Sequence, residues 1–206
     1  MSSVFGLRMQ QLARGFLGNL KKNLGGGDMA KRKNELWEWT KALLIAVGLA
    51  VIIRYFLFAP IVVDGLSMMP TLHNGDRMIV NKLGKPNRFD IVVFHAPEKK
   101  DYIKRVIGLP GDRIEYKNDV LYINGKAYKE PYLDKYKKIT QGPLTEDFTL
   151  KDLIGRDTVP KGEIFVMGDN RRQSKDSRII GPVPLSKVIG DTKLIYWPMK
   201  DIHIVK

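Results

Sequence analysis

An apolar segment of 18 residues, 42–59, constrains this chain more than any other feature of its sequence. Its first part, ALLIAVGLAVII, contains only apolar residues and glycine, and Arg54 precedes its last five residues. A helix of this length is close to the shortest that spans a hydrocarbon core of about 30 Å. An arginine near one end can extend its guanidinium to the membrane interface. We therefore expect a transmembrane helix at 42–59 rather than a buried core helix.

The residues before this segment indicate its orientation. Basic and aromatic residues typical of membrane flanks precede it: Lys31, Arg32, Lys33, Lys41, Trp37 and Trp39. By the positive-inside rule, residues 1–41 are expected to be cytoplasmic and residues 60–206 extracytoplasmic. A cleaved signal peptide is the alternative, but no small-x-small site closes the apolar run. We interpret the segment as a retained signal anchor of a single-pass cell-membrane protein.

The first 28 residues have two interpretations. They could form a weak basic amphipathic helix on the inner membrane surface. Alternatively, translation starts at Met29, because Met-Ala-Lys-Arg-Lys is an ordinary basic start to an anchor. The codons of Gly25–Gly27 would then belong to a ribosome-binding site. N-terminal sequencing of the native protein distinguishes the two.

Composition excludes several classes of function. The net charge of +13 is spread among acidic residues, with no arginine-rich helix and no aromatic-interleaved basic motif, so we do not expect nucleic-acid binding. The chain has no cysteine, which excludes disulfides, thiol catalysis and thiolate metal sites. The sequence contains neither a metal-ligand cluster nor a phosphate-binding loop, and we expect no metal and no cofactor.

After residue 60 the sequence has the pattern of a β domain. Short runs rich in β-branched and aromatic residues alternate with glycine, proline and asparagine. Strands are predicted at 77–81, 90–94, 102–107, 120–125, 163–169 and 193–197. Asn124-Gly125 predicts a hairpin that returns at 126–128. Residues 129–161 are polar and charged, and we expect a surface excursion there. These features indicate a mainly β fold with a coiled or barrel-like antiparallel sheet.

Ser67 follows the apolar run by eight residues and is a candidate nucleophile. A serine hydroxyl needs a base to take its proton, and histidine is the usual one. His73 lies in an HNGD turn, His95 follows a strand end and His203 is near the C-terminus. Each is more typical of a structural or solvent-facing histidine, which makes a Ser-His-Asp triad the weaker interpretation.

Lys104 is the other candidate base. Free lysine is protonated at neutral pH because its pKa is about 10.4, but burial lowers that pKa. In a strand, Lys104 shares a face with Tyr102 and Val106 and would lie in an apolar row. The spacing alone nevertheless favours an ordinary strand lysine that reaches solvent, so the residues by themselves leave the base open.

Four motifs occur in a fixed order along the chain. They are SMMPT (Ser67–Thr71), a GDxxxV-like box (Gly75–Val80), KRVIGLPGD (Lys104–Asp112) and GDNRRQSKDSR (Gly168–Arg178). In these motifs the chain resembles the type I signal peptidases of the short Gram-positive kind, peptidase family S26. The resemblance extends from the apolar segment to about Trp197. It implies a membrane-bound serine endopeptidase that removes signal peptides from exported preproteins.

The resemblance also assigns roles to individual residues. It implies that Ser67 is the nucleophile and that Lys104 is the general base, which later acts as an acid toward the leaving amine. Ser174 matches a serine whose hydroxyl helps to orient the lysine, and Asp176 and Arg178 match a pair that supports the site. The expected architecture is thus an antiparallel β domain carrying a Ser-Lys dyad, anchored by one N-terminal transmembrane helix.

The oxyanion hole and the substrate pockets are less completely defined by the motifs. Some family members carry a hydroxyl residue where this chain has Gly65, so the Ser67 backbone N–H would donate with less side-chain help. Substrate is expected to bind as an added strand, and the resemblance implies small residues at the first and third positions before the cut. Met68 could line such a pocket, touch lipid or pack in the core. The expected partners are secretory preproteins and membrane lipid.

Two other functions fit parts of this pattern. A Ser-Lys dyad also serves self-cleavage in the SOS-response repressors, but those proteins carry a DNA-binding domain instead of a membrane anchor. A non-enzymatic anchored β domain that binds cell-wall or secreted partners would leave Ser67 and Lys104 as bystanders. Turnover of an Ala-x-Ala peptide in detergent separates these functions.

Overall fold

The computed structural model describes residues 27–54, 58–199 and 202–204. The chain divides into two compact units, residues 1–52 and 53–206. The two interpretations of the first 28 residues concern a segment of which residues 1–26 lie outside the described part. The predicted membrane segment at 42–59 likewise includes residues 55–57, which are not described.

In the first unit, the described residues form helix α2 (Gly27–Ile52). Its sequence is rich in alanine, leucine and charged residues and contains no proline, which favours a continuous helix. The large apolar side chains from Leu43 to Ile52 are all more than half exposed. Among the described residues, no helix combines the length and the apolar character that a membrane crossing requires.

The second unit is built on an eight-stranded sheet in which every pair of neighbours is antiparallel. The strands follow the order β1-β2-β11-β3-β4-β9-β10, and β12 pairs with β11. Their bounds are β1 (Phe58–Val62), β2 (Arg77–Asn81), β3 (Ile91–His95), β4 (Asp101–Gly108), β9 (Glu163–Met167), β10 (Val183–Pro184), β11 (Val188–Trp197) and β12 (His203–Ile204). The prediction of a mainly β antiparallel fold is confirmed.

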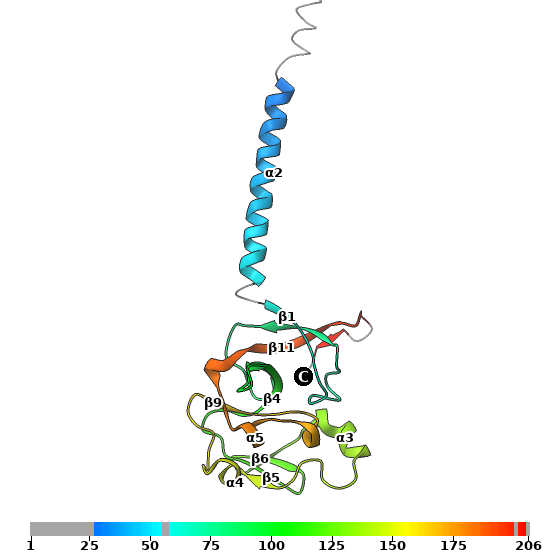
Figure 1. Cartoon of the computed structure of the whole chain (residues 1–206), viewed down its shortest axis with the longest axis vertical. Coiled ribbons are helices and arrows are strands. Elements are labelled where there is room, and N and C mark those ends of the chain that lie inside the picture. Colours follow the sequence, from blue (N-terminus) through cyan, green and yellow to red (C-terminus); the bar gives the residue numbers. More distant parts are fainter. Residues whose placement is uncertain (1–26, 55–57, 200–201, 205–206) are drawn as a thin grey trace, which may run out of the picture. The chain divides into compact units, whose positions relative to one another are not determined.

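A smaller, four-stranded sheet lies at the end of this unit away from β1 and β11 (Figure 1). Its order is β7-β6-β5-β8, with β5 (Ile114–Lys117), β6 (Val120–Ile123), β7 (Lys126–Tyr128) and β8 (Phe148–Thr149). Asn124 and Gly125 both have positive φ, 53° and 79°, between β6 and β7. This is the geometry of the two-residue hairpin turn that the Asn-Gly pair predicts.

The second unit also contains short helical segments: η2 (Pro131–Leu133), α3 (Asp134–Ile139), α4 (Leu150–Ile154), η3 (Arg171–Gln173), α5 (Ser177–Ile180) and η4 (Leu185–Lys187). The expectation that 129–161 is a surface excursion is wrong for part of this segment. Leu133 and Leu150 are almost fully buried, and β8 pairs with β5. The polar composition hid this packing because the buried apolar residues are few and are widely spaced among polar and charged ones.

The sheet places one side of β4 against the core of the second unit. β3 is buried at four of its five positions, and β4 runs from exposed at Asp101 to fully buried at its far end. β4 lies between β3 and β9, with Val92 of β3 opposite Lys104. A lysine in the middle of this strand therefore has packed apolar strands on both sides.

Candidate active site

Ser67 lies in a tight turn that begins five residues after β1 ends. The neighbouring Met68 and Leu72 are almost fully buried and pack into one core cluster, and this packing anchors the turn to the core. Gly65 adopts a positive φ of 102°, and its N–H donates to Asn74 Oδ1 at 2.9 Å. Ser67 is thus held by local hydrogen bonding and by the apolar residues on either side of its turn.

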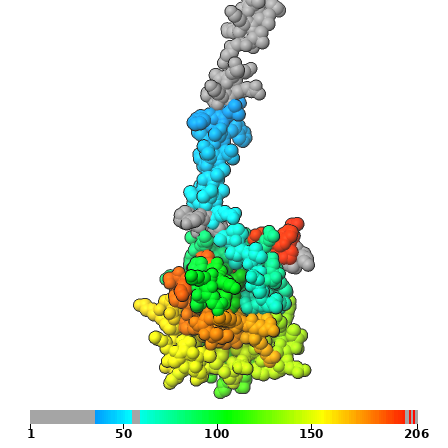
Figure 2. Space-filling model, in the orientation of Figure 1, coloured from blue at the N-terminus to red at the C-terminus, as the bar shows by residue number. Residues whose placement is uncertain are grey.

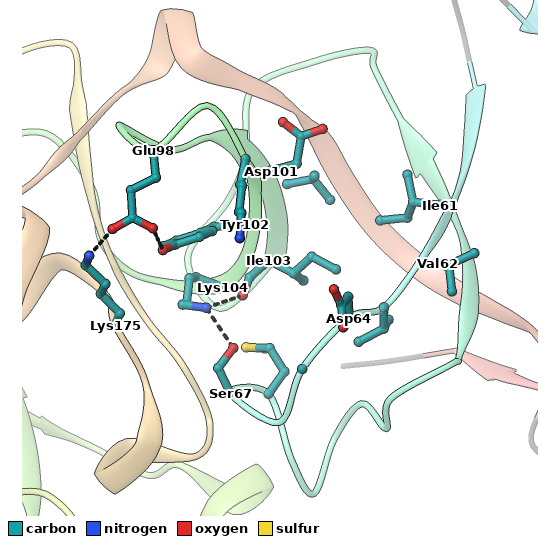
Figure 3. A pocket seen from close by; sticks show the side chains of 15 residues that line it. Ile61, Val62, Asp64, Ser67, Glu98, Asp101, Tyr102, Ile103, Lys104 and Lys175 are labelled. Atoms are coloured by element: carbon teal, nitrogen blue, oxygen red, sulfur yellow. Dashed lines mark hydrogen bonds and ion pairs between the residues drawn. The ribbon is translucent and has the colours of Figure 1, made fainter.

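The Lys104 side chain reaches this serine from β4 (Figure 3). Its Nζ atom is 2.7 Å from Ser67 Oγ and also donates to the carbonyl of Ile103 at 2.9 Å. The lysine is only 4% exposed, and its ammonium group lies 5.1 Å from the centre of the Tyr102 ring. The structure therefore brings together the two residues that the first and third motifs supplied.

Burial changes the acid–base character of Lys104. Desolvation lowers the pKa of its amine from 10.5 to about 8, against a smaller opposing effect of the Asp176 and Asp169 carboxylates. Within the described residues, Lys104 forms no salt bridge with a carboxylate. A substantial fraction of the amine is therefore neutral near pH 8, and a neutral amine can accept a proton from a serine hydroxyl.

The last motif forms a loop beside the pair. A Cβ on Gly168 would come within 2.2 Å of Ser174 Oγ and 2.5 Å of the Ser67 carbonyl oxygen, so the loop can only approach this closely with glycine there. Asp176 accepts from the Gly168 N–H at 3.0 Å, and Arg178 Nε donates to Asp176 Oδ1 at 2.8 Å. Asp176 and Arg178 thus hold the backbone of the loop.

Ser174 is placed next to the pair but is not bonded to it. The residue is 8% exposed, and its Oγ atom is buried without a hydrogen-bond partner among the described residues. The orienting hydrogen bond from Ser174 to Lys104 that the resemblance implies is therefore not formed in this structure. Its Oγ instead packs against Gly168.

Sequence reasoning missed a fully buried ion pair behind the site. Arg105 donates to both carboxylate oxygens of Asp169, at 2.9 and 2.7 Å, and both side chains are 0% exposed. Thr71 also donates its hydroxyl hydrogen to Asp169. Through these bonds Asp169 connects β4 with the serine turn. The sequence signal for this ion pair is the position of Arg105 between Ile103 and Ile107 on one face of a predicted strand.

A pocket of about 670 Å³ opens over the pair and includes Gly65 and Met68 in its lining. On one side, Lys175 pairs with Glu98, which also accepts from the Tyr102 hydroxyl at 2.9 Å (Figure 3). The surface segments around residues 100 and 175, green and orange, meet there (Figure 2). On the other side, Figure 3 shows the side chains of Ile61, Val62 and Asp64.

The Ser67 backbone N–H donates no hydrogen bond within the described part of the chain. By contrast, the N–H of Gly65 is already bonded to Asn74. Only the first of these two amides is therefore open to a developing oxyanion in this arrangement.

Neither His73 nor His95 forms a hydrogen bond with the serine in the described part of the chain. His73 Nδ1 is 3.9 Å from an oxygen of the buried Asp76, and His95 Nδ1 is 2.7 Å from an oxygen of Asp101; both imidazoles are exposed. The side chain of His203 lies outside the described residues. In the described parts, no group of three or more histidine or acidic residues is arranged to hold a metal ion.

Comparison with known proteins places this geometry in a family. The family model described as signal peptidase, peptidase S26, matches residues 36–197. Signal peptidase I of Bacillus caldolyticus is 51% identical over 82% of this chain and 94% of its own length. Signal peptidase I T of Bacillus subtilis is 44% identical over 90% of this chain and 98% of its own length.

Relatives outside that genus agree. Signal peptidase IB of Staphylococcus aureus is 42% identical over 82% of this chain and 93% of its own length. The crystal structure of a signal peptidase I from Enterococcus faecalis has a TM-score of 0.52 and 44% identity, covering 53% of this chain and 97% of that one. On the strength of these matches over most of its length, the chain belongs to the type I signal peptidases, serine hydrolases of peptidase family S26.

Proposed function

We propose that this chain is a membrane-bound endopeptidase that cleaves signal peptides from exported preproteins with a Ser67–Lys104 dyad. The observation that carries the proposal is the 2.7 Å separation between Ser67 Oγ and Lys104 Nζ at a lysine with a lowered pKa. The similarity to the signal peptidases I described above supports the substrate class.

In the proposed reaction Lys104 accepts and donates a proton twice, once in each half of the reaction. Neutral Lys104 accepts the hydroxyl proton as Ser67 Oγ bonds to the scissile carbonyl carbon, and the Ser67 N–H donates to the oxyanion. The Lys104 ammonium then protonates the leaving amine as the C–N bond breaks, which leaves an acyl-enzyme. Water then attacks the ester carbon as neutral Lys104 accepts one of its protons. The Lys104 ammonium returns that proton to Ser67 Oγ as the ester C–O bond breaks, which releases the signal peptide with a C-terminal carboxylate and restores the pair.

The remaining motif residues would position the Ser67–Lys104 pair without bonding to the substrate. Asp176 would hold the 168–178 loop in place through its bond to the Gly168 N–H, and Arg178 would hold Asp176. Ser174 would orient Lys104 at a stage of the reaction when its hydroxyl turns toward the amine. All three are positioning residues in this scheme, because none of them bonds to Ser67 or Lys104 in the structure.

Substrate would lie in the pocket as an extended chain, with main-chain hydrogen bonds and small side-chain pockets. The pocket includes Val63 and Met68, which are both almost fully buried, beside Ser67. Packed apolar walls of this kind favour small side chains before the cut. Gly65 adds no side chain of its own, so substrate can approach the turn closely.

We further propose that residues 42–59 anchor the chain in the cell membrane, with 1–41 cytoplasmic and 60–206 extracytoplasmic. The exposed apolar side chains of α2 support this, since such a surface is stabilised by lipid rather than water. The chain has no cysteine, so single cysteines at Lys31 and Lys161 can report topology. An impermeant maleimide added to intact cells should label only Lys161→Cys, and labelling only of Lys31→Cys would reverse the orientation.

The central test is cleavage of a preprotein by the full chain in detergent between pH 6 and 10. Ser67→Ala and Lys104→Met should each lower kcat/KM by about 10³-fold or more. The exposed controls Ser186→Ala and Lys117→Met should be unaffected. Because the pKa of Lys104 is about 8, wild-type kcat/KM should fall about tenfold per pH unit below that pH.

Two results would contradict the dyad. Near-normal turnover by Lys104→Met would reassign the base, and His73→Ala and His95→Ala would then be measured. Binding of the preprotein without turnover by the wild type would favour an anchored binding domain instead.

A further inference from the structure

A second buried cation lies behind the pair, in the same loop as Ser174. The Arg171 guanidinium is fully buried, and Nη2 donates to Glu130 Oε1 at 2.6 Å. Its Nη1 donates to the Tyr116 hydroxyl and, at 3.1 Å, to Thr145 Oγ1. Tyr116 belongs to β5 of the small sheet, and Glu130 and Thr145 lie in the segment between its strands β7 and β8.

Glu130 concentrates its hydrogen bonds on one oxygen. Oε1 accepts from the hydroxyls of Tyr116 and Tyr132, both at 2.7 Å, in addition to Arg171. Oε2 is buried and has no partner among the described residues. A buried ion pair of this kind is costly to desolvate, and well-packed apolar residues often replace such pairs without loss of stability. Stability alone therefore does not account for the placement of Glu130.

The Arg171 side chain continues toward the nucleophile. Its Nε donates to the Gly168 carbonyl at 3.0 Å, and Gly168 packs against both the Ser67 carbonyl and Ser174. In the same loop, the Asn170 N–H donates to the Ser67 carbonyl at 3.0 Å. Glu130 is thus linked to the backbone of the serine turn through a single arginine and the short loop that carries it.

Tyr132 provides a second connection to the same place. Its hydroxyl is bonded to Glu130, and the Arg105 guanidinium lies 3.9 Å from the centre of its ring. Arg105 in turn holds Asp169, the residue between Gly168 and Asn170. Two arginines therefore hold neighbouring residues of the loop. Arg171, which bonds to Gly168, is paired with Glu130, and Arg105, which bonds to Asp169, contacts the ring of Tyr132.

We propose that Glu130 is a positioning residue for the Ser67–Lys104 pair, because it holds Arg171 against the Gly168 carbonyl. Tyr116 and Thr145, which also bond to Arg171, then support the same loop. This inference rests on the proposed function, since it assigns a role toward the same reaction. A loop displaced by about 1 Å can lower a rate by about 100-fold.

Two substitutions separate positioning from stability. Glu130→Gln keeps the size of the side chain and an acceptor but removes the charge that holds Arg171. Arg171→Lys keeps a cation opposite Glu130 but removes the Nε bond to Gly168. We expect each to lower kcat by about 10- to 100-fold with KM within about twofold, at a temperature where thermal unfolding shows the variant to be folded.

The matched controls and the double variant sharpen this test. Glu146→Gln, an exposed acid of the same segment, should leave kcat unchanged. The double variant Glu130→Gln/Arg171→Lys should lose little more than Arg171→Lys alone, because both act through the same Gly168 contact. Hydrogen exchange at Asn170, whose N–H bonds to Ser67, should become faster in both single variants.

Failure of this inference is distinguishable from failure of the proposed function. If the wild type cleaves a preprotein and the folded Glu130→Gln and Arg171→Lys variants keep a wild-type kcat, the positioning role is wrong. A lower melting temperature with unchanged kcat would likewise assign Glu130 to folding alone. If the wild type itself cleaves no preprotein, the proposed function is wrong.

Discussion

Lys104 and Arg171 are two buried cations in one active-site region, and they have opposite acid–base behaviour. Desolvation lowers the pKa of Lys104 to about 8, since its hydrogen-bond partners are a hydroxyl and a carbonyl rather than a carboxylate. Desolvation also acts on Arg171, but Tyr116 and the Glu130 carboxylate hold its pKa well above the ordinary value. The higher intrinsic pKa of a guanidinium and the nature of the partner together decide which of these two buried cations can release its proton.

The same comparison explains why one residue is suited to chemistry and the other to structure. A lysine that loses its charge easily can exchange a proton with Ser67 within one reaction cycle. An arginine that keeps its charge can hold the Gly168 carbonyl at every pH at which the protein is folded. Three predictions test this difference, each by a change in the free energy of unfolding.

The largest effect is expected when Arg171 loses its carboxylate. Glu130→Ala would leave the guanidinium buried without a counter-ion and should lower the free energy of unfolding by about 3–5 kcal/mol. Equilibrium urea denaturation of the full chain in detergent measures this, with the exposed Glu146→Ala as control. A change below about 1 kcal/mol would mean that Tyr116 and Thr145 satisfy Arg171 without Glu130.

Removal of the Lys104 amine should raise the free energy of unfolding, whereas removal of the Glu130 carboxylate should lower it. Because the folded pKa of Lys104 is lowered to about 8, the unfolded state binds more protons between pH 8 and 10.5. The burial of the protonated amine therefore lowers the free energy of unfolding by its full amount below pH 8. This loss of stability disappears as pH rises from 8 to 10.5. Lys104→Met should therefore stabilise the protein at pH 7, by at most about 3 kcal/mol.

Measurement of unfolding at two pH values makes this prediction specific. The wild type should gain stability between pH 7.5 and 9.5, and Lys104→Met should lack that gain. Lys117→Met, at an exposed position, should follow the wild type. Equal pH dependence in wild type and Lys104→Met would show that the amine of Lys104 is not desolvated as the structure indicates.

The sequence predicted the site better than its surroundings. Alternation along 102–107 placed Lys104 in an apolar row, but the spacing alone favoured a lysine that reaches solvent, whereas β4 buries it. The motifs identified Ser67, and the Asn124-Gly125 pair identified the hairpin. These features depend on residues close together in the chain, or on a strand pattern with a period of two.

The Glu130–Arg171 pair could not be predicted in this way. Its members are 41 residues apart, and each stands among charged neighbours that indicate a solvated surface. Short strands such as β8 and β10, two residues each, also carry too few residues for a pattern. Long-range pairing of this kind depends on the packing of the two sheets, which no local pattern records.

The smallest change in the free energy of unfolding is expected at Ser174. Its hydroxyl has neither a carboxylate partner like Arg171 nor a hydroxyl or carbonyl partner like Lys104 in the described structure. Its buried Oγ makes no hydrogen bond in the described structure, so Ser174→Ala removes none and should change the free energy of unfolding by less than about 1 kcal/mol. If its hydroxyl turns to Lys104 during the reaction, kcat should nevertheless fall. Urea denaturation and turnover of the same variant therefore give separate answers. A loss of stability above about 2 kcal/mol would reveal a folded-state hydrogen bond at Oγ, and unchanged kcat would remove Ser174 from the proposed mechanism.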